Sequence, residues 1–228
     1  MKKIDIGQYG FVSLEVSCAD DLSVVNAARV SFSKKSYELE EGDTKLIHFL
    51  MKEKHGTPFE HNYFRFHVKC PIFVAREWFR HRISSFNEMS MRYHVPDIET
   101  FLPQASDFRT QVGKPGNYTF EPMDNPGGYL EYLQNKILQS YTLAEETYEE
   151  LISRGVAKEL ARIVLPVGTY TEFYWSLNAR SLMNFISLRN SEHAQKEIRD
   201  YAVAVESLFQ GEMPYTYQAF VDCDRVAV

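Results

Sequence analysis

The sequence predicts an α+β fold, a single mixed domain spanning residues 1–228 with a central antiparallel sheet and packed helices. The segment Phe64–Cys70 alternates apolar and polar residues, as a half-buried strand requires, whereas Leu130 to Leu151 repeats apolar residues at helical spacing. Strands and helices follow one another without a regular strand-helix-strand rhythm, which favours α+β over a doubly wound sheet. A chain of 228 residues is long enough to bury a core without disulfides or metals.

The N-terminal part is expected to form a strand pair followed by two helices. Residues 2–16 carry β-branched and aromatic residues around two glycines, which is typical of a short strand pair. Asp20 or Asp21 is suited to cap a helix that runs through Arg29. After a polar, acidic loop, a second helix with apolar residues at helical spacing should end near Gly56.

The clearest strand, Phe64 to Cys70, is followed at once by a helix signal. Pro71 suits the first turn of a helix, because its missing N–H is not needed there. Ile72, Ala75 and Phe79 are expected to mark the buried side of that helix.

The second half alternates between irregular and strongly periodic segments. Prolines and glycines accumulate from residue 94 to 128, which indicates an irregular or lid-like region. The long helix to Leu151 should stop at Gly155, and a shorter one should stop at Pro166. A strand through Trp175 follows, and helices resume from Asn178.

Composition excludes several classes of function. A formal net charge of -6 argues against a broad nucleic-acid-binding face, which depends on clustered cationic charge. No apolar run approaches the ~20 residues of a membrane span, and the N-terminus lacks a signal-peptide core. Cys18, Cys70 and Cys223 are odd in number, widely spaced and without a Cys-x-x-Cys pair, so neither a disulfide framework nor a zinc site is indicated. A reducing cytoplasm fits this pattern.

The segment from Arg80 to Tyr93 is the densest cluster of chemistry-bearing residues. It holds three arginines, one histidine, one glutamate and three serines. Arg76, Glu77, Arg80 and His81 are expected to share one face of the preceding helix. Planar cations of this kind grip phosphate or carboxylate in a fixed fork, although a solvated helix end with ion pairs has the same composition.

The spacing within this cluster resembles a family signature. The pattern Arg-His-Arg, seven residues, then Ser runs here from Arg80 to Ser90 and resembles the signature of flavin-dependent thymidylate synthases. The resemblance omits only the region from about residue 106 to 125. It extends through further segments: Ala28–Phe32, His55–His61, Ala161–Pro166 and Asn178–Phe185, with Arg189 and His193 beyond.

This resemblance implies a fold, a reaction and a set of ligands. Members share a mixed α+β fold of their own and assemble as homotetramers with active sites built from several subunits. They convert dUMP to dTMP for dTTP synthesis, with methylenetetrahydrofolate as carbon donor. Reduced FAD supplies the hydride, and NADPH reduces the FAD. The cofactor and substrates expected here are therefore FAD, NADPH, methylenetetrahydrofolate and dUMP, with no metal.

The resemblance also implies the residues of the site. Those expected to bind FAD are Thr57, Arg80, His81, Arg82, Glu88, Asn178, Arg180 and Asn184. Those expected to bind dUMP are Glu77, Arg80, Glu88, Ser90, Arg92, Arg162 and Arg189. Arg92 and Arg162 are assigned to the phosphate, and Arg189 is the catalytic residue that stabilises charge developing on the uracil.

Some assignments keep an alternative at this point. Glu77 would repel a nucleotide phosphate unless arginines intervene, so it could contact the sugar or a cationic neighbour instead. Without the resemblance, Asn178 would be interpreted as a helix N-cap and Arg180 as a surface residue. His67 is interpreted as structural, and Glu60 as a flavin-edge contact at most. At the level of the whole protein, a non-catalytic nucleotide sensor and a metal-dependent nucleotide hydrolase are the competing hypotheses.

Overall fold

The structure is a computed structural model that describes residues 2–93, 97–114 and 117–228. Its residues group into two compact units, Met1–Met89 with Thr171–Val228, and Ser90–Tyr170. The chain therefore leaves the first unit once and returns to it. The single domain over residues 1–228 stays a prediction.

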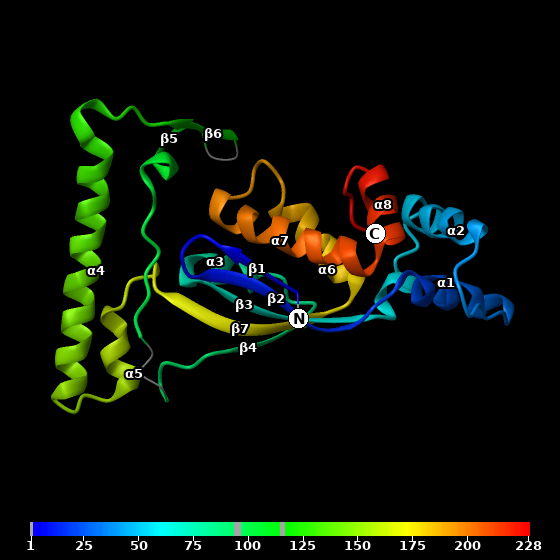
Figure 1. The fold of residues 1–228 in the computed structure, drawn as a ribbon, viewed down its shortest axis with the longest axis horizontal. Coiled ribbons are helices and arrows are strands. Elements are labelled where there is room, and N and C mark those ends of the chain that lie inside the picture. Colours follow the sequence, from blue (N-terminus) through cyan, green and yellow to red (C-terminus); the bar gives the residue numbers. More distant parts are fainter. Residues whose placement is uncertain (1, 94–96, 115–116) are drawn as a thin grey trace. The chain divides into compact units, whose positions relative to one another are not determined.

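The first unit is built on a five-stranded sheet in the order β1-β2-β3-β7-β4 (Figure 1). The strands are β1 (Lys2–Ile6), β2 (Gly10–Cys18), β3 (Tyr63–Pro71), β4 (Ser85–Glu88) and β7 (Tyr170–Leu177). The pairs β1/β2, β2/β3 and β4/β7 are antiparallel. Between β3 and β7, the Tyr63 hydroxyl donates to the Ser176 hydroxyl, and His67 is hydrogen-bonded to Glu172. Residue numbers thus rise along β3 while they fall along β7, so these two strands are also antiparallel. The predicted N-terminal strand pair and central antiparallel sheet are confirmed.

Helices cover one face of this sheet, where α6 and α7 lie side by side (Figure 1). The helical elements of the unit are α1 (Asp21–Arg29), η1 (Val30–Phe32), α2 (Glu41–Lys52), η2 (Thr57–Glu60), α3 (Ile72–Trp78), α6 (Ala179–Arg189), α7 (Lys196–Glu212) and α8 (Pro214–Asp222). Asp20 caps α1 by accepting a hydrogen bond from the Ser23 N–H, as predicted. Its neighbour Asp21 is buried and instead accepts from the Thr216 N–H at the start of α8, which ties the two helices together.

The core between sheet and helices is aromatic, and Trp78 stands at its centre. Its ring centroid lies 4.7 Å from that of Phe185 on α6 and 5.2 Å from that of Trp175 on β7. Truncating a side chain packed in this way typically costs about 3–5 kcal/mol. Because Trp78 is the last residue of α3, its burial fixes where the next residues of the chain emerge.

One expectation about α3 is wrong, and a second is confirmed only in part. The helix ends at Trp78, so Arg80 and His81 lie beyond it and share no helical face with Glu77. The buried residues of this helix are Val74, Ala75 and Trp78, which confirms Ala75, whereas Ile72 and Phe79 are only half-buried. The segment is apolar nearly all round and only two turns long, so its periodicity cannot identify the buried side. The chain must also turn before Ser85 in order to pair β4 with β7.

The second unit contains the long helix and a hairpin. Its elements are η3 (Ala105–Asp107), β5 (Arg109–Lys114), β6 (Asn117–Pro122), η4 (Pro126–Gly128), α4 (Tyr129–Ser153), α5 (Lys158–Ala161) and η5 (Arg162–Val164). The predicted stop at Gly155 is confirmed by its positive φ of 80°. The β5/β6 hairpin lies within the segment predicted to be irregular. Its β5 strand has no apolar alternation, and although Tyr118 and Phe120 alternate with polar residues on β6, that strand is exposed on both faces. Residues 94–96 and 115–116 of that segment lie outside the described residues.

In the part of the chain that the structure describes, none of the helices has the length and apolarity needed to cross a bilayer.

Candidate active site

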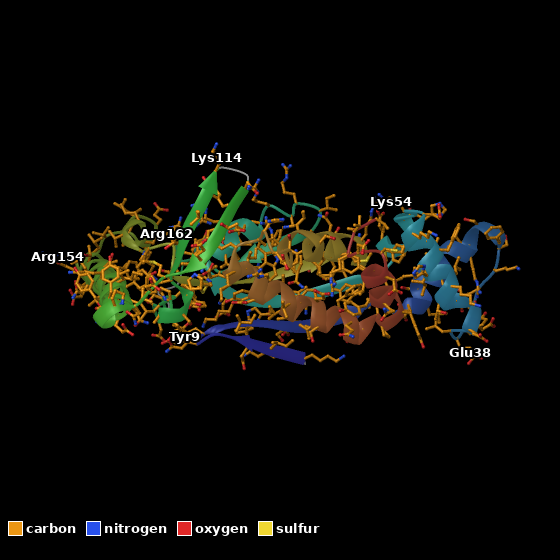
Figure 2. The ribbon with its side chains drawn as sticks, turned by 90° about the horizontal axis from the view of Figure 1, so that it is seen from above. Tyr9, Glu38, Lys54, Lys114, Arg154 and Arg162 are labelled. Atoms are coloured by element: carbon orange, nitrogen blue, oxygen red, sulfur yellow. The ribbon has the colours of Figure 1, made fainter. Side chains whose placement is uncertain are left out.

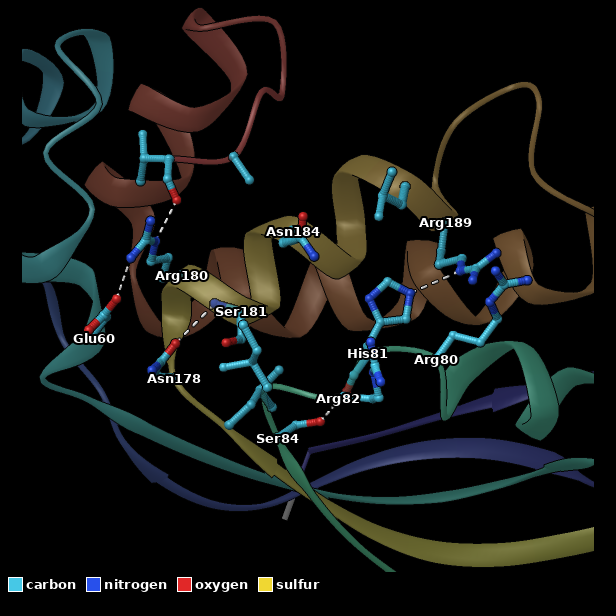
Figure 3. Close-up of a pocket in the computed structure, with 15 residues that line it drawn as sticks. Glu60, Arg80, His81, Arg82, Ser84, Asn178, Arg180, Ser181, Asn184 and Arg189 are labelled. Atoms are coloured by element: carbon cyan, nitrogen blue, oxygen red, sulfur yellow. Dashed lines mark hydrogen bonds and ion pairs between the residues drawn. The ribbon is translucent and has the colours of Figure 1, made fainter.

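A cavity of about 890 Å³ lies in the first unit, between the start of α6, the segment after α3 and the C-terminal residues (Figure 3). This volume is within the range of sites that enclose a small molecule or cofactor. Its lining residues are Glu60, Arg80, His81, Arg82, Ile83, Ser84, Leu177, Asn178, Arg180, Ser181, Asn184, Leu188, Arg189, Ala227 and Val228.

The lining is strongly cationic. Four arginines face the cavity against one acidic side chain, Glu60. Guanidinium groups bind phosphate and carboxylate oxygens through paired N–H donors, and they stay charged at any physiological pH. The cavity is therefore suited to an anionic ligand with several acceptor oxygens.

Helix α6 presents one polar side to the cavity and buries the other. Asn178 is its N-cap, with the Oδ1 atom accepting from the Ser181 N–H at 3.0 Å. Asn178 also lines the cavity, so its amide N–H₂ group remains available to a ligand. Arg180 and Asn184 are four residues apart and both face the cavity, whereas Phe185 is fully buried. The N-cap and ligand-binding interpretations of Asn178 are thus compatible.

Arg180 is held at the edge of the cavity by two oxygens from distant parts of the chain. Its Nη1 atom pairs with the carboxylate of Glu60, and its Nε atom donates to the Val228 carbonyl oxygen at 2.6 Å. Gly56 lies behind it, and a Cβ atom there would come within 2.7 Å of the Arg180 Nε and Cζ atoms. The absence of a side chain at Gly56 makes room for the guanidinium group.

Arg189 is the last residue of α6 and lies at the opposite end of the cavity from Arg180 (Figure 3). Its Nε atom donates to His81 Nε2 at 3.0 Å. Its Nη1 atom donates to Glu77 Oε2 and its Nη2 atom to the Glu77 carbonyl oxygen, each at 3.0 Å. Of the alternatives considered for Glu77, the structure shows the contact with a cationic neighbour, and that neighbour is Arg189.

The imidazole of His81 is neutral in this environment. Burial, followed by the charges of Arg189 and Arg80, lowers its pKa from 6.5 to about 4. The ring packs edge-on against Phe185, with the ring centroids 5.0 Å apart. His81 is therefore an oriented, uncharged hydrogen-bonding group at physiological pH.

The predicted site residues divide into three groups by position. Those that line the cavity are Arg80, His81, Arg82, Asn178, Arg180, Asn184 and Arg189. Those that lie in the first unit without lining it are Thr57, Glu77 and Glu88. Ser90, Arg92 and Arg162 belong to the second unit.

Several of the residues outside the lining have defined surroundings. Thr57 begins η2, the short helix that ends with Glu60. Glu88 accepts a hydrogen bond from the Thr171 hydroxyl at 2.7 Å. In the second unit, Arg92 Nε donates to the Ser90 hydroxyl at 3.3 Å, and Arg162 is exposed (Figure 2).

Sequence reasoning missed part of the lining. Ser181 and Leu188 share the α6 side that carries Arg180 and Asn184, so helical spacing from those two residues could have identified them. Ala227 and Val228 could not have been found in this way, since they reach the cavity only through the fold of the C-terminal segment.

The structural role predicted for His67 and the possibility of a metal site can both be compared with the structure. His67 lies on the sheet with Nε2 3.0 Å from Glu172 Oε2 and its ring against Tyr174, which agrees with a structural role. Among the described residues, no group of three or more His, Cys, Asp or Glu side chains is placed to hold a metal ion.

Comparison with known proteins identifies the family. A family model described as "Thymidylate synthase complementing protein" matches residues 14–215. A protein of Thermotoga neapolitana named flavin-dependent thymidylate synthase is 46% identical over 220 residues, covering 96% of this chain and 94% of that protein. The chain belongs to the flavin-dependent thymidylate synthase family. The resemblance inferred from the Arg80 to Ser90 signature is confirmed, and these proteins are methyltransferase enzymes.

Other members support the assignment in sequence and in structure. A flavin-dependent thymidylate synthase of Thermosipho melanesiensis is 47% identical, with 93% of this chain and 90% of that protein covered. A solved structure described as a UMP/dUMP methylase PolB from Streptomyces cacaoi, bound with 5-Br dUMP, superposes with a TM-score of 0.88. That chain is 38% identical, and the match covers 99% of this chain and 100% of that one. The α+β fold class is thereby confirmed.

Proposed function

We propose that this enzyme methylates dUMP to dTMP, taking the carbon from methylenetetrahydrofolate and the hydride from FAD that NADPH has reduced. The cavity with four arginines and the amide groups of Asn178 and Asn184 is the observation that carries this proposal. The chain belongs to a flavin-dependent family, so a flavin is the expected occupant of the cavity. The hydrogen-bond donors of the lining suit the diphosphate and ribose of FAD. The solved relative described as a UMP/dUMP methylase supports a uridine nucleotide as the methyl acceptor.

The residues proposed to hold FAD are Thr57, Arg80, His81, Arg82, Glu88, Asn178, Arg180 and Asn184. Arg80, Arg82 and Arg180 supply positive charge for the diphosphate, while the two asparagines offer amide donors and acceptors. When bound in its reduced form, the flavin supplies the hydride. The residues of the chain orient it and exclude water from the cavity.

The residues proposed to make up the dUMP site are Glu77, Arg80, Glu88, Ser90, Arg92, Arg162 and Arg189. Ser90 and Arg92 are hydrogen-bonded to each other, so both can address one phosphate group. Arg162 is exposed and free of carboxylate contacts among the described residues, as a phosphate ligand should be. Arg92 and Arg162 are therefore assigned to the phosphate.

Arg189 is proposed to activate the uracil. A guanidinium group has five N–H donors, and the contacts with His81 and Glu77 engage three of them. One N–H on each terminal nitrogen is left for the imide edge of the base. Charge that develops on the uracil ring is stabilised there, which increases the nucleophilicity of ring carbon 5.

A covalent enzyme adduct is not part of this proposal. Attack by a cysteine on ring carbon 6 needs an accessible thiolate in an electropositive setting. Cys70 is fully buried, and burial together with the nearby charge of Glu88 raises the pKa of its thiol well above the usual value. Cys18 and Cys223 lie outside the lining of the cavity. Ser90 is interpreted as a hydrogen-bond partner of dUMP.

A homotetramer in the cytoplasm, with active sites shared between subunits, is proposed as the working assembly. Large apolar side chains are exposed on both units, among them Phe32 at 75% and Ile163 at 71%. Exposed apolar groups of this size are common at protein interfaces. The three cysteines are free, in agreement with a reducing compartment.

A direct test is to purify the protein, denature it and identify the released flavin. We expect FAD, bleaching of its absorbance by NADPH, and dTMP formation from dUMP and methylenetetrahydrofolate. A protein that neither carries nor takes up FAD would refute the proposal. Nucleotide binding without flavin would favour a sensor, and nucleotide hydrolysis that a chelator abolishes would favour a metal-dependent hydrolase.

A further inference from the structure

Three side chains form a continuous hydrogen-bonded chain at one end of the cavity. Glu77 comes from α3, His81 from the segment after α3, and Arg189 from the end of α6. All three contacts of the Arg189 guanidinium measure 3.0 Å, two to Glu77 and one to His81. Arg189 and Glu77 are largely shielded from solvent, with 18% and 27% of their side chains exposed.

The direction of each hydrogen bond follows from the chemistry of arginine. A guanidinium group only donates, so Nε2 of His81 must be the acceptor. In a neutral imidazole the other nitrogen then carries the proton, and the low pKa of His81 keeps the ring neutral. Figure 3 shows that this second nitrogen lies on the side of the ring toward Asn184. His81 lines the cavity, so its Nδ1–H is a donor available to a ligand.

We propose that Glu77 is a positioning residue: it fixes Arg189, and Arg189 in turn fixes His81 in the tautomer that presents Nδ1–H to the bound flavin. The Glu77 carboxylate and backbone oxygen each accept a hydrogen bond from the Arg189 guanidinium, and these two bonds fix the plane of the guanidinium. A long side chain that is ordered before the ligand arrives loses less conformational freedom on binding. The identities of nucleotide and flavin rest on the proposed function.

This role also accounts for a carboxylate in a site for an anionic nucleotide. Beside a phosphate, an uncompensated carboxylate would weaken binding by repulsion. The Glu77 carboxylate instead pairs with Arg189, which lines one end of a cavity that has three further arginines in its lining. Glu77 therefore acts on the nucleotide through Arg189.

The first test is ¹⁵N NMR of the histidine rings in the full-length protein. We expect His81 to show the Nδ1–H tautomer at neutral pH, and Glu77→Gln to convert it into a mixture of tautomers. Glu150→Gln, which breaks an exposed ion pair with Arg154 on α4, should leave the His81 signals unchanged. A proton on Nε2 of His81 in the parent protein would overturn the proposal. This measurement needs neither flavin nor turnover.

The second test is a double-mutant cycle on the dissociation constant of dUMP. Glu77→Gln should raise that constant about tenfold, since Arg189 loses its charged partner and is held less firmly by its contacts with the residue 77 backbone oxygen and with His81. In an Arg189→Gln background the same change should have no further effect, because Glu77 acts through Arg189. An unchanged or lowered constant in Glu77→Gln, or an equal factor in both backgrounds, would contradict the positioning role. Failure of the protein to bind dUMP at all would instead contradict the proposed function.

Discussion

Replacing Arg180 by Ala should weaken FAD binding much more than it destabilises the fold. In the protein, Arg180 pairs with Glu60, but 45% and 38% of the two side chains are exposed to solvent. Ion pairs between groups this exposed contribute about 0–1 kcal/mol, and the bond to the Val228 carbonyl adds about 1 kcal/mol. We therefore expect a loss of at most about 2 kcal/mol in the free energy of unfolding.

The effect on FAD binding should be larger, because the lost group is a cation that faces an anionic ligand. A hydrogen bond to a charged group typically contributes about 1.5–3 kcal/mol. That range corresponds to roughly a 10- to 150-fold rise in the FAD dissociation constant. Glu60 would add to the loss, since its charge would no longer be compensated beside the cavity.

The assay is a titration of the flavin-free protein with FAD, followed by flavin fluorescence, together with urea unfolding of the same variants. Arg154→Ala is the matched control, because Arg154 forms an exposed ion pair with Glu150 near the end of α4 and does not line the cavity (Figure 2). The reasoning fails if both variants bind FAD equally well. It also fails if the loss of FAD affinity in Arg180→Ala is matched by an equal loss of stability.

Four further predictions concern other parts of the enzyme. Gly56→Ala should push the Arg180 guanidinium aside and raise the FAD dissociation constant without unfolding the protein. The same FAD titration and urea unfolding measure the two effects. Arg162→Ala should weaken dUMP binding by about 1.5–3 kcal/mol but leave deoxyuridine binding nearly unchanged, as measured by calorimetry. Replacing all three cysteines by Ala should preserve FAD-dependent dTMP synthesis, with about 1 kcal/mol of stability lost at the buried Cys70; rescue of an inactive variant by one cysteine would refute this. Because the pKa of His81 is about 4 when folded but 6.5 when unfolded, only the unfolded state takes up this proton between those values. Stability should therefore fall as the pH drops from 6.5 to 4, and His81→Gln should flatten that part of the profile of unfolding midpoints.

Local patterns in the sequence determined much of the secondary structure and part of the site. Strict alternation predicted the strand from Phe64 to Cys70, whose alternating apolar residues are fully buried in β3, because successive strand residues point to opposite faces. Helical spacing and Gly155 predicted α4 and its end. On α6, helical spacing predicted that Arg180 and Asn184 address one ligand, since residues four apart share one side of a helix, whereas Asn178 was assigned through the family resemblance. The Arg80 to Ser90 signature pointed to the family.

Only the tertiary structure decided which partners these residues have. Arg189 lies 112 positions from Glu77, and Arg180 lies 48 from Val228, so no local pattern relates them. The early end of α3 depends on the pairing of β4 with β7, which is also a contact between distant segments. Periodicity reports which side of an element is buried, whereas a site is defined by side chains that the packing of several elements brings together. For this reason the motif identified the arginines, but the roles of Glu77, His81 and the C-terminal residues became visible only in the folded chain.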